Sequence, residues 1–246
     1  MNLEGHNVVV VGGSSGIGWA VAKAVLAKGA EVVLAARNHD KLEKARAELG
    51  AGARVRSVVA DIGREADVAR LLEEARQGSA AQTVHHVVVT AADPAYQPLP
   101  TFDIEGARRV IDSKLLGPFL VAKHAAGVLD PQGSMTFTSG IAFERPAPQG
   151  SMVAAANGGI VSLVRALAIE LAPIRVNTLS PGWVDTPIWD RLAGDSKPAR
   201  FAQMAERLPA RRIGRPEELA HAAIFLMENT FTTGTVLHVD GGHRMA

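Results

Sequence analysis

Cysteine is absent from this 246-residue sequence, and aromatic residues, runs of like charge and long apolar runs are scarce. Without cysteine the chain has no disulfide, no thiolate nucleophile and no cysteine metal site. The formal net charge is +1, from 26 lysines and arginines against 25 acidic residues. Charge therefore favours no nucleic-acid partner. No apolar stretch approaches the roughly 20 residues of a membrane span, so we also predict no membrane partner.

The rest of the composition is typical of a globular protein, with 47% hydrophobic and 21% charged residues. Aromatic residues make up 4%, whereas alanine, valine, leucine and glycine are abundant, which suits helices packed closely on a parallel sheet. The polar residues 1–6 lead directly into an apolar run. We therefore expect no signal peptide and a cytoplasmic location.

Short β-branched runs alternate along the chain with longer segments whose apolar residues recur at helical spacing. We expect strands at residues 7–11, 31–34, 54–59, 85–89, 134–138, 175–179 and 236–239. We expect helices at residues 17–28, 40–49, 65–76, 104–128, 150–171 and 216–227. This alternation predicts an α/β fold, a Rossmann-type doubly wound parallel sheet of about seven strands with helices on both faces.

No repeat, low-complexity tract or Pro/Gly-rich linker divides the chain, so we predict a single domain over residues 1–246. The one long irregular stretch, residues 181–215, follows a late strand. In a doubly wound sheet such a connection lies over the ligand crevice, so we interpret it as a substrate-covering loop and helix. Its large apolar residues would form either a lid or part of the core; they are Trp183, Ile188, Trp189 and Met204.

A glycine-rich segment, residues 12–18 (GGSSGIG), lies between the first apolar run and a helical segment. Gly12 permits a tight turn, Gly16 lets the backbone approach a pyrophosphate, and Gly18 lets the helix pack close to the strand. Free amides at the helix start then hold the anion. The neighbouring side chains would be Ser14, Ser15 and Ile17. The alternative is an ordinary turn, but the strand–loop–helix order favours dinucleotide binding.

The residues after the second predicted strand indicate which dinucleotide is bound. A protein that prefers NAD usually has an acid at this strand end, which accepts from the ribose 2′-hydroxyl. This chain has Ala36 there, followed by Arg37 and Asn38. A guanidinium suits a 2′-phosphate, so we predict NADP(H) with Arg37 and Asn38 in its site. The alternative is a solvated surface arginine.

Four segments in the same order resemble those of short-chain dehydrogenases/reductases, and the likeness extends along the whole chain. They are the Gly12, Gly16 and Gly18 spacing, residues 59–62 (VADI), residues 179–187 (LSPGWVDTP) and residues 234–242 (GTVLHVDGG). The resemblance implies that Asp61 and Ile62 flank adenine, while Val184 and Thr186 hold the nicotinamide carboxamide. It adds to the cofactor site Ala91, Pro181 and Gly182. It also implies a homodimer or homotetramer.

Members of this family carry a catalytic Asn, Ser, Tyr and Lys, and the sequence departs from that set. Ser139 matches the serine at the end of a strand. The chain's one tyrosine, Tyr96, lies far upstream in a proline-rich loop. The register that we prefer, set by the downstream helix, places the Tyr and Lys positions at Val153 and Asn157. A count forward from the serine gives instead Met152 and Ala156.

A lysine stands where the family has its asparagine, at Lys114, and Asn157 stands where the family has its lysine. These positions lie side by side in the family's fold, so a reciprocal exchange would return an ammonium and an amide to one pocket. We hypothesise that Lys114 binds the nicotinamide ribose or a water, with Asn157 orienting it. The alternative is drift after loss of activity, with Lys114 reaching solvent from a helix face.

The sequence thus predicts an NADP(H)-dependent oxidoreductase acting on a carbonyl or activated double bond of a small, apolar substrate through an atypical site. Because Val153 cannot donate a proton, Lys114, Ser139 or water would do so. Two alternatives stay open: an NADP(H)-binding sensor or structural subunit without turnover, and a non-redox isomerase or lyase. No metal is predicted, because the histidines examined have no carboxylate at ligand spacing; these are His85, His86 and His238.

Overall fold

The computed structural model describes residues 3–50 and 52–246. These residues form a seven-stranded sheet in the order β3-β2-β1-β4-β5-β6-β7, and every neighbouring pair is parallel. The strands are β1 (Asn7–Val11), β2 (Glu31–Ala36), β3 (Val55–Val59), β4 (Val84–Val89), β5 (Leu129–Thr138), β6 (Arg175–Pro181) and β7 (Val236–Val239). The order reverses between β1 and β4, where doubly wound sheets hold their ligands. The predicted fold class is confirmed.

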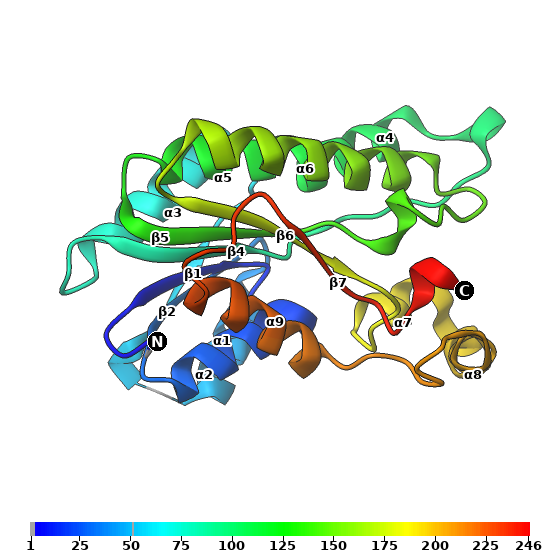
Figure 1. Ribbon diagram of the computed structural model, residues 1–246, viewed down its shortest axis with the longest axis horizontal. Coiled ribbons are helices and arrows are strands. Elements are labelled where there is room, and N and C mark those ends of the chain that lie inside the picture. The colour runs from blue at the N-terminus through cyan, green and yellow to red at the C-terminus, as the bar shows by residue number, and fades with distance from the viewer. Residues whose placement is uncertain (1–2, 51) are drawn as a thin grey trace.

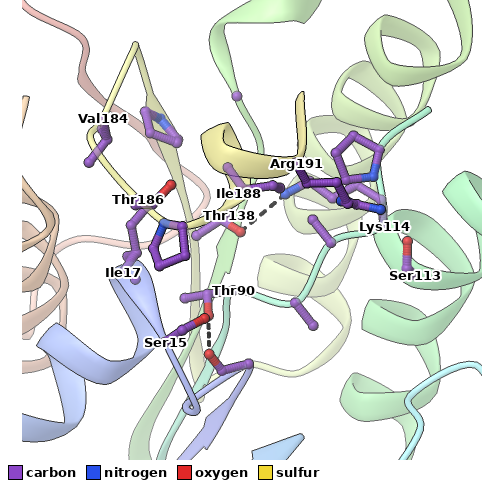
Figure 2. Close-up of a pocket in the computed structure, with 18 of the residues that line it drawn as sticks. Ser15, Ile17, Thr90, Ser113, Lys114, Thr138, Val184, Thr186, Ile188 and Arg191 are labelled. Atoms are coloured by element: carbon purple, nitrogen blue, oxygen red, sulfur yellow. Dashed lines mark hydrogen bonds between the residues drawn. The ribbon is translucent and has the colours of Figure 1, made fainter. Parts of the chain in front are cut away.

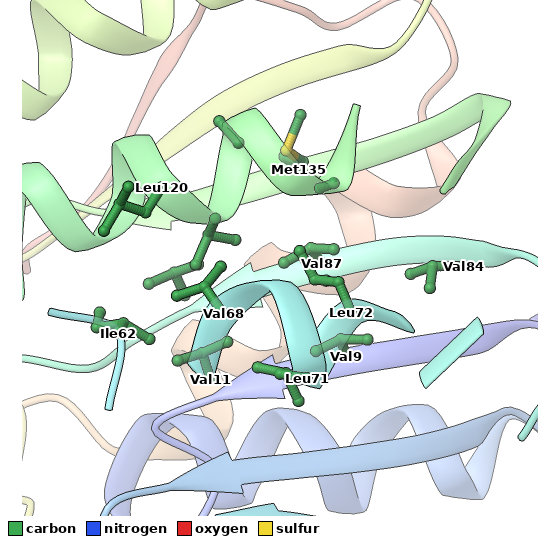
Figure 3. Packing of buried hydrophobic residues seen from close by; sticks show 14 of the residues in the cluster. Val9, Val11, Ile62, Val68, Leu71, Leu72, Val84, Val87, Leu120 and Met135 are labelled. Atoms are coloured by element: carbon green, nitrogen blue, oxygen red, sulfur yellow. The ribbon is translucent and has the colours of Figure 1, made fainter. Parts of the chain in front are cut away.

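The central strand β1 is buried along its whole length because helices cover both faces of the sheet. Its side chains alternate between those faces: Val9 and Val11 join one apolar cluster, and Val8 and Val10 join the other. Figure 3 shows the first cluster, in which Val9 and Val11 lie close to Leu71 of helix α3 (Glu65–Gln77). The two cores hold the sheet between them, so they also fix where the loops at its carboxyl edge begin.

The helices form a layer on each face of the sheet (Figure 1). Residues of α3, α5 and α6 pack in one core, and residues of α1, α2 and α9 pack in the other. The bounds are α1 (Gly16–Ala27), α2 (His39–Leu49), α3 (Glu65–Gln77), α4 (Ile104–Ile111), α5 (Gly117–Ala125), α6 (Ser151–Glu170), α7 (Ile188–Ala193), α8 (Lys197–Arg207) and α9 (Pro216–Glu228). The helices expected on both faces are therefore present.

The helix expected at residues 104–128 is present as an unbroken helical run that ends at Ala125, but its middle is not α-helical. A π-helical turn, Asp112–Leu116, separates α4 from α5, and β5 begins soon afterwards, at Leu129. The Gly117 N–H donates to the carbonyl of Asp112, five residues back. Pro118 has no N–H with which to continue the α-helical ladder to the carbonyl of Lys114. The turn therefore widens at Lys114, which is a predicted site residue.

The apolar helix α6 corrects the expectation that no stretch approaches the length of a membrane span. It has 20 residues and a mean hydropathy of 1.7 in its most apolar window, so by length and composition it could cross a membrane. In this fold its apolar side chains Ile160, Val164 and Leu167 are buried in the core against the sheet. The core helix of a globular protein is apolar for this reason.

The connection after β6, which the sequence analysis describes as irregular, contains the two helices α7 and α8. Figure 1 shows both beside the carboxyl ends of β6 and β7. A single parallel bridge between Val184 and Gly214 closes the base of this connection. The connection therefore lies beyond the carboxyl edge of the sheet, where the ligand crevice of such folds is found.

Candidate active site

A cavity of about 600 Å³ opens at the carboxyl ends of the strands. The loops that follow β1 to β6 supply its walls, so it lies where the strand order reverses (Figure 2). Its volume is within the range of small-molecule and cofactor sites. Every residue that the sequence predicts for the cofactor or for catalysis lines this cavity, with the exception of Gly18.

The glycine-rich loop between β1 and α1 forms one wall of the cavity. Gly12 and Gly16 have φ angles of +87° and +55°, which glycine adopts without strain. Gly18 faces the strand instead: a Cβ there would lie 2.3 Å from the carbonyl oxygen of Gly12 and 2.6 Å from Oγ1 of Thr90. Thr90 at the end of β4 donates from this hydroxyl to the carbonyl of Val11, at 3.1 Å. Neighbouring strand ends therefore hold the glycine-rich loop at the wall of the cavity.

The end of β2 gives the cavity a basic border. Arg37 is more than half exposed, and its guanidinium lies 3.4 Å from the carboxylate of Asp93. Asn38 caps α2, because its side chain accepts from the N–H of Lys41 at 2.9 Å. Lys41 lines the cavity too, although the sequence analysis does not single it out. Two cations therefore stand where a ribose 2′-phosphate is expected.

Asp93 follows β4 and connects three parts of the site. In addition to Arg37, it accepts from Nη1 of Arg191 on α7 at 2.9 Å. Its own N–H donates to the hydroxyl of Ser113 in the π-helical turn, at 3.0 Å. The carboxylate is largely covered, whereas both arginines are mostly exposed. Asp93 thus anchors the start of the 181–215 connection over the cavity.

The loop after β3 carries the two residues that are predicted to flank adenine. Asp61 orders its own turn, because its carboxylate accepts from the N–H of Gly63 at 2.9 Å. Ile62 is buried and lies directly against Gly117, where a Cβ would be 2.7 Å from the Ile62 Cγ1. Both residues line the cavity, in agreement with their predicted place.

The ammonium of Lys114 lies inside the cavity rather than at the surface. Its Nζ donates to Oγ1 of Thr138 at 3.2 Å, shown as a dashed line in Figure 2. Because Thr138 donates in turn to the carbonyl of Val89 at 3.1 Å, its hydroxyl presents an acceptor to the lysine. Burial lowers the pKa of Lys114 from 10.5 to about 8. The group is therefore largely protonated at neutral pH and can release its proton readily.

Ser139 and Asn157 lie together, but they do not make the contacts that the sequence analysis proposes. The Ser139 hydroxyl is buried and donates to the backbone carbonyl of Asn157 at 2.9 Å. Its proton is thus engaged, so in this geometry it can accept but not polarise a carbonyl. Oδ1 of Asn157 is buried without a hydrogen-bond partner among the described residues. The hydrogen-bond partner of Lys114 is Thr138 and not Asn157.

The α7 side of the cavity is aromatic. Trp183 and Trp189 have ring centroids 4.2 Å apart, and Phe201 of α8 meets both edge-on. The indole N–H of Trp189 donates to the carbonyl of Val184 at 3.0 Å, which fixes the pair above the loop. Of the four apolar residues left open as lid or core, three line the cavity and Met204 is buried outside it.

The remaining predicted cofactor residues come from strand ends. They are Ala91 after β4, and Pro181, Gly182, Val184 and Thr186 at and after β6. Gly182 is required by its surroundings, since a Cβ there would lie 2.7 Å from the backbone of Asp240. Thr186 faces the glycine-rich loop, because its side chain would be 3.3 Å from a Cβ at Gly16. The β1 and β6 loops therefore face each other across the cavity.

The histidines are structural in character. His86 is buried, with its two ring nitrogens 2.8 Å from Oγ of Ser134 and 3.1 Å from Nδ1 of His6. His238 lies 3.5 Å from the carboxylate of Glu144. Across residues 3–50 and 52–246, no group of three or more His, Asp or Glu side chains could hold a metal ion.

Two kinds of site residue escaped the sequence analysis. Thr138 is adjacent to the predicted Ser139, so the same strand end could have drawn attention to it. Asp93, Tyr96 and Arg191 also line the cavity or contact its walls. Asp93 and Tyr96 lie in the irregular connection after β4 and Arg191 lies on the short helix α7, where no residue spacing distinguishes them from ordinary surface positions.

Comparisons with known proteins agree with this geometry. A family model described as Enoyl-(Acyl carrier protein) reductase matches residues 11–244. The short-chain dehydrogenase/reductase malC of Malbranchea aurantiaca is 36% identical, covering 98% of this chain and 95% of its own. The solved structure of the MalC reductase/Diels-Alderase from that organism has a TM-score of 0.92 at 36% identity, covering 99% of this chain and 98% of the other.

A solved small-chain dehydrogenase in complex with NADPH is also similar, with a TM-score of 0.81, 29% identity and coverage of 97% of this chain and 98% of that chain. The match in sequence and structure extends over nearly the whole length in each case. The chain belongs to the short-chain dehydrogenase/reductase family of oxidoreductases.

Proposed function

We propose that this protein is an NADP(H)-dependent oxidoreductase that acts on a carbonyl or activated double bond of a small, apolar substrate through an atypical catalytic site. The observation that carries the proposal is the Lys114 ammonium, held inside the cavity that the glycine-rich loop also lines. Val153 and Asn157 line the same cavity at the positions assigned to the family's tyrosine and lysine. The site therefore keeps a cation but obtains it from a different element.

The residues present fit a dinucleotide. At Gly12 a Cβ would lie 2.7 Å from the backbone N of Ala91, and at Gly16 it would meet Thr186 at 3.3 Å. Neighbouring protein atoms fill the space on that side of each glycine, so only glycine permits this close turn, and the N-terminus of α1 directs its partial positive charge toward the cavity. The loop after β2 and the loop after β6 then give such a ligand a basic end and an apolar end.

The preference for the 2′-phosphate is supported by charge. Arg37 stands where an NAD-dependent protein has an acid, and its contact with Asp93 is 3.4 Å long and mostly exposed. An exposed pair of this kind is worth little, so the guanidinium is available to a phosphate. A similar dehydrogenase has been solved with NADPH bound.

Residues of this chain would bind the cofactor, stabilise charge and exclude water during the reaction. The nicotinamide, when bound, supplies or accepts a hydride. Lys114 donates hydrogen bonds from a desolvated ammonium, either to the nicotinamide ribose or to a developing oxyanion. Trp183 and Trp189 cover the apolar end and exclude water from it. The Ser139 hydroxyl oxygen can accept a hydrogen bond from a ligand. The hydrogen bond that this hydroxyl donates to the Asn157 carbonyl holds the end of β5 against α6.

The cofactor preference is tested by fluorescence titration of NADPH and NADH. We expect NADPH to bind more tightly, and Arg37→Ala to weaken NADPH at least about tenfold while leaving NADH unchanged, because a charge-assisted pair to phosphate is lost. Arg46→Ala, an exposed arginine of α2 paired with Glu43, is the matched control and should change neither affinity. Equal affinities for both dinucleotides in the wild type would contradict the proposal.

Turnover is tested with NADPH and two apolar probes, menadione and cyclohexenone. The proposal expects NADPH oxidation that falls at least about tenfold in kcat in Lys114→Met, since one oxyanion donor is worth that much or more. Tight NADPH binding without oxidation over a broad panel of carbonyls and enones would instead identify a binding module without turnover.

A further inference from the structure

Tyr96 is the only tyrosine in the chain, and the fold brings it to the cavity. In the sequence it lies in a proline-rich loop, 57 positions before Val153, where the family's tyrosine is expected. In the structure that loop connects β4 to α4 and passes the start of α6. A phenol thus enters the same pocket from a different element.

The Tyr96 loop is attached to the segment that begins α6. The N–H of Gln97 donates to the carbonyl of Gln149 at 3.0 Å, and the Gln97 side chain accepts from the N–H of Asp103 at 2.8 Å. A Cβ on Gly150 would lie 3.2 Å from Cε1 of Tyr96 and 3.4 Å from its Cδ1. The ring therefore covers Gly150 at the N-terminus of α6, and glycine leaves the room it needs.

This contact places the phenol next to the position that lost its tyrosine. Val153 follows Gly150 by three residues, so the two lie on the same face of the helix, one turn apart. Val153 is buried and lines the cavity together with Tyr96. The phenol ring therefore lies against the residue one turn before Val153.

The hydroxyl of Tyr96 is free to act on a ligand. It makes no hydrogen bond within the part of the chain that the structure describes, and the residue is 40% exposed. Partial burial raises the pKa of the phenol, which keeps it protonated through the neutral range. The exposed part gives solvent a route by which to restore a lost proton.

We propose that Tyr96 is the catalytic proton donor of this site, supplied by the β4–α4 loop in place of a tyrosine on α6. The inference rests on the proposed function. In the reductive direction the carbonyl carbon receives the hydride with its electron pair from NADPH, and the C=O π bond breaks. The oxygen takes the proton of the Tyr96 hydroxyl, and water then reprotonates the phenolate. Lys114 donates a hydrogen bond to the developing oxyanion.

A first experiment needs no turnover. Protein labelled with ¹³C at tyrosine Cζ gives a single resonance, because there is one tyrosine, and its pH titration reports the pKa of Tyr96 directly. The positive nicotinamide of NADP⁺ should lower that pKa relative to the complex with neutral-ring NADPH. The two cofactors differ in charge at this ring, so equal pKa values in both complexes would place the phenol away from the reacting end and overturn the proposal.

A second experiment uses turnover of menadione with NADPH. Tyr96→Phe keeps the ring and its packing on Gly150, so we expect unchanged NADPH affinity and thermal stability. Loss of a general acid should lower kcat about a hundredfold or more. An unchanged kcat in Tyr96→Phe would overturn the proposal. If the wild type binds NADPH but reduces nothing, the proposed function fails, while the resonance still decides where Tyr96 lies.

Discussion

Lys114 carries its positive charge in a buried position, where the loss of hydration destabilises the charged form. Among the described residues its hydrogen-bond partner is the hydroxyl of Thr138, and no carboxylate contributes to the shift of its pKa, which burial alone lowers to about 8. The folded protein therefore holds this proton less tightly than the unfolded chain, where the pKa is 10.5. A group that costs stability is expected at a functional position, because activity and stability are optimised separately.

We expect Lys114→Met to stabilise the protein at pH 7. At about 1.4 kcal/mol for each pKa unit, the burial cost has an upper limit of about 3 kcal/mol, which partial exposure reduces. Between pH 8 and 10.5 the unfolded chain binds more protons than the folded one, so the free energy of unfolding of the wild type rises across that window. The gain from Lys114→Met should shrink accordingly, as urea unfolding at several pH values would show.

Lys44→Met is the matched control, because Lys44 is an exposed lysine of α2. Its effect should stay within about 0.5 kcal/mol at every pH. A Lys114→Met variant that is less stable than the wild type at pH 7 would mean that the ammonium is held by more than Thr138.

At the scale of elements, the packing of α1 on β1 decides whether the cofactor loop exists. Gly18 is in the first turn of α1, and a Cβ there would overlap the carbonyl of Gly12 and the hydroxyl of Thr90. Both of those atoms belong to strand ends that the core holds in place. A larger residue would therefore displace the helix and not the strands, and the amides at its N-terminus would move with it.

Gly18→Ala should for this reason reduce both stability and NADPH binding. Overpacking of a rigid site costs about 1–3 kcal/mol in the free energy of unfolding, and NADPH affinity should fall at least about tenfold. The comparison is Gly127→Ala, because a Cβ on exposed Gly127 would meet nothing within 4 Å. Thermal melts with and without NADPH measure both effects. Equal behaviour of the two variants would show that α1 has room to shift.

At the scale of the whole molecule, a histidine cluster joins three strands at the end of the sheet opposite the cavity. His86 of β4 contacts Ser134 of β5, and His6 precedes β1. Burial lowers the pKa of His86 from 6.5 to about 3, and those of His6 and His85 are lowered as well. All three are therefore neutral in the folded protein near pH 7.

This cluster should make the fold sensitive to acid. Because the folded-state pKa of His86 lies below the unfolded one, its contribution is complete above pH 6.5 and is lost as the pH falls toward 3. We expect the free energy of unfolding to fall by about 1–3 kcal/mol between pH 6.5 and 4 on account of His86. His86→Gln can still bond Ser134 but does not titrate, so it should show a shallower decline in urea unfolding. An equally steep decline would assign acid sensitivity to other groups.

The quaternary structure and the location in the cell stay predictions. A homodimer or homotetramer is implied by the family, and sedimentation of the purified chain would measure its mass. A cytoplasmic location is likewise an expectation from the sequence.

The local pattern of the sequence was sufficient for the parts of the protein that depend on backbone conformation and on periodic burial. Strand and helix positions follow from the alternation of apolar periods, and the cofactor loop follows from three glycines whose spacing is imposed by a tight turn and a close helix. The segments expected at adenine and nicotinamide were indicated by the family resemblance, and in the structure their residues line the cavity at strand ends. The π-helical turn was missed, because the apolar spacing continues across Gly117 and Pro118 and so predicts a single α-helix.

Only the tertiary structure decided which groups meet. It joins the Ser139 hydroxyl to a carbonyl of α6, gives Lys114 the acceptor Thr138, and brings Tyr96 from a distant loop against Gly150. The physical reason is that these contacts depend on the order of strands in the sheet, which places β4, β5 and α6 side by side although they are far apart in the chain. Residue spacing records the turns of one segment, but proximity between segments is created by the common core.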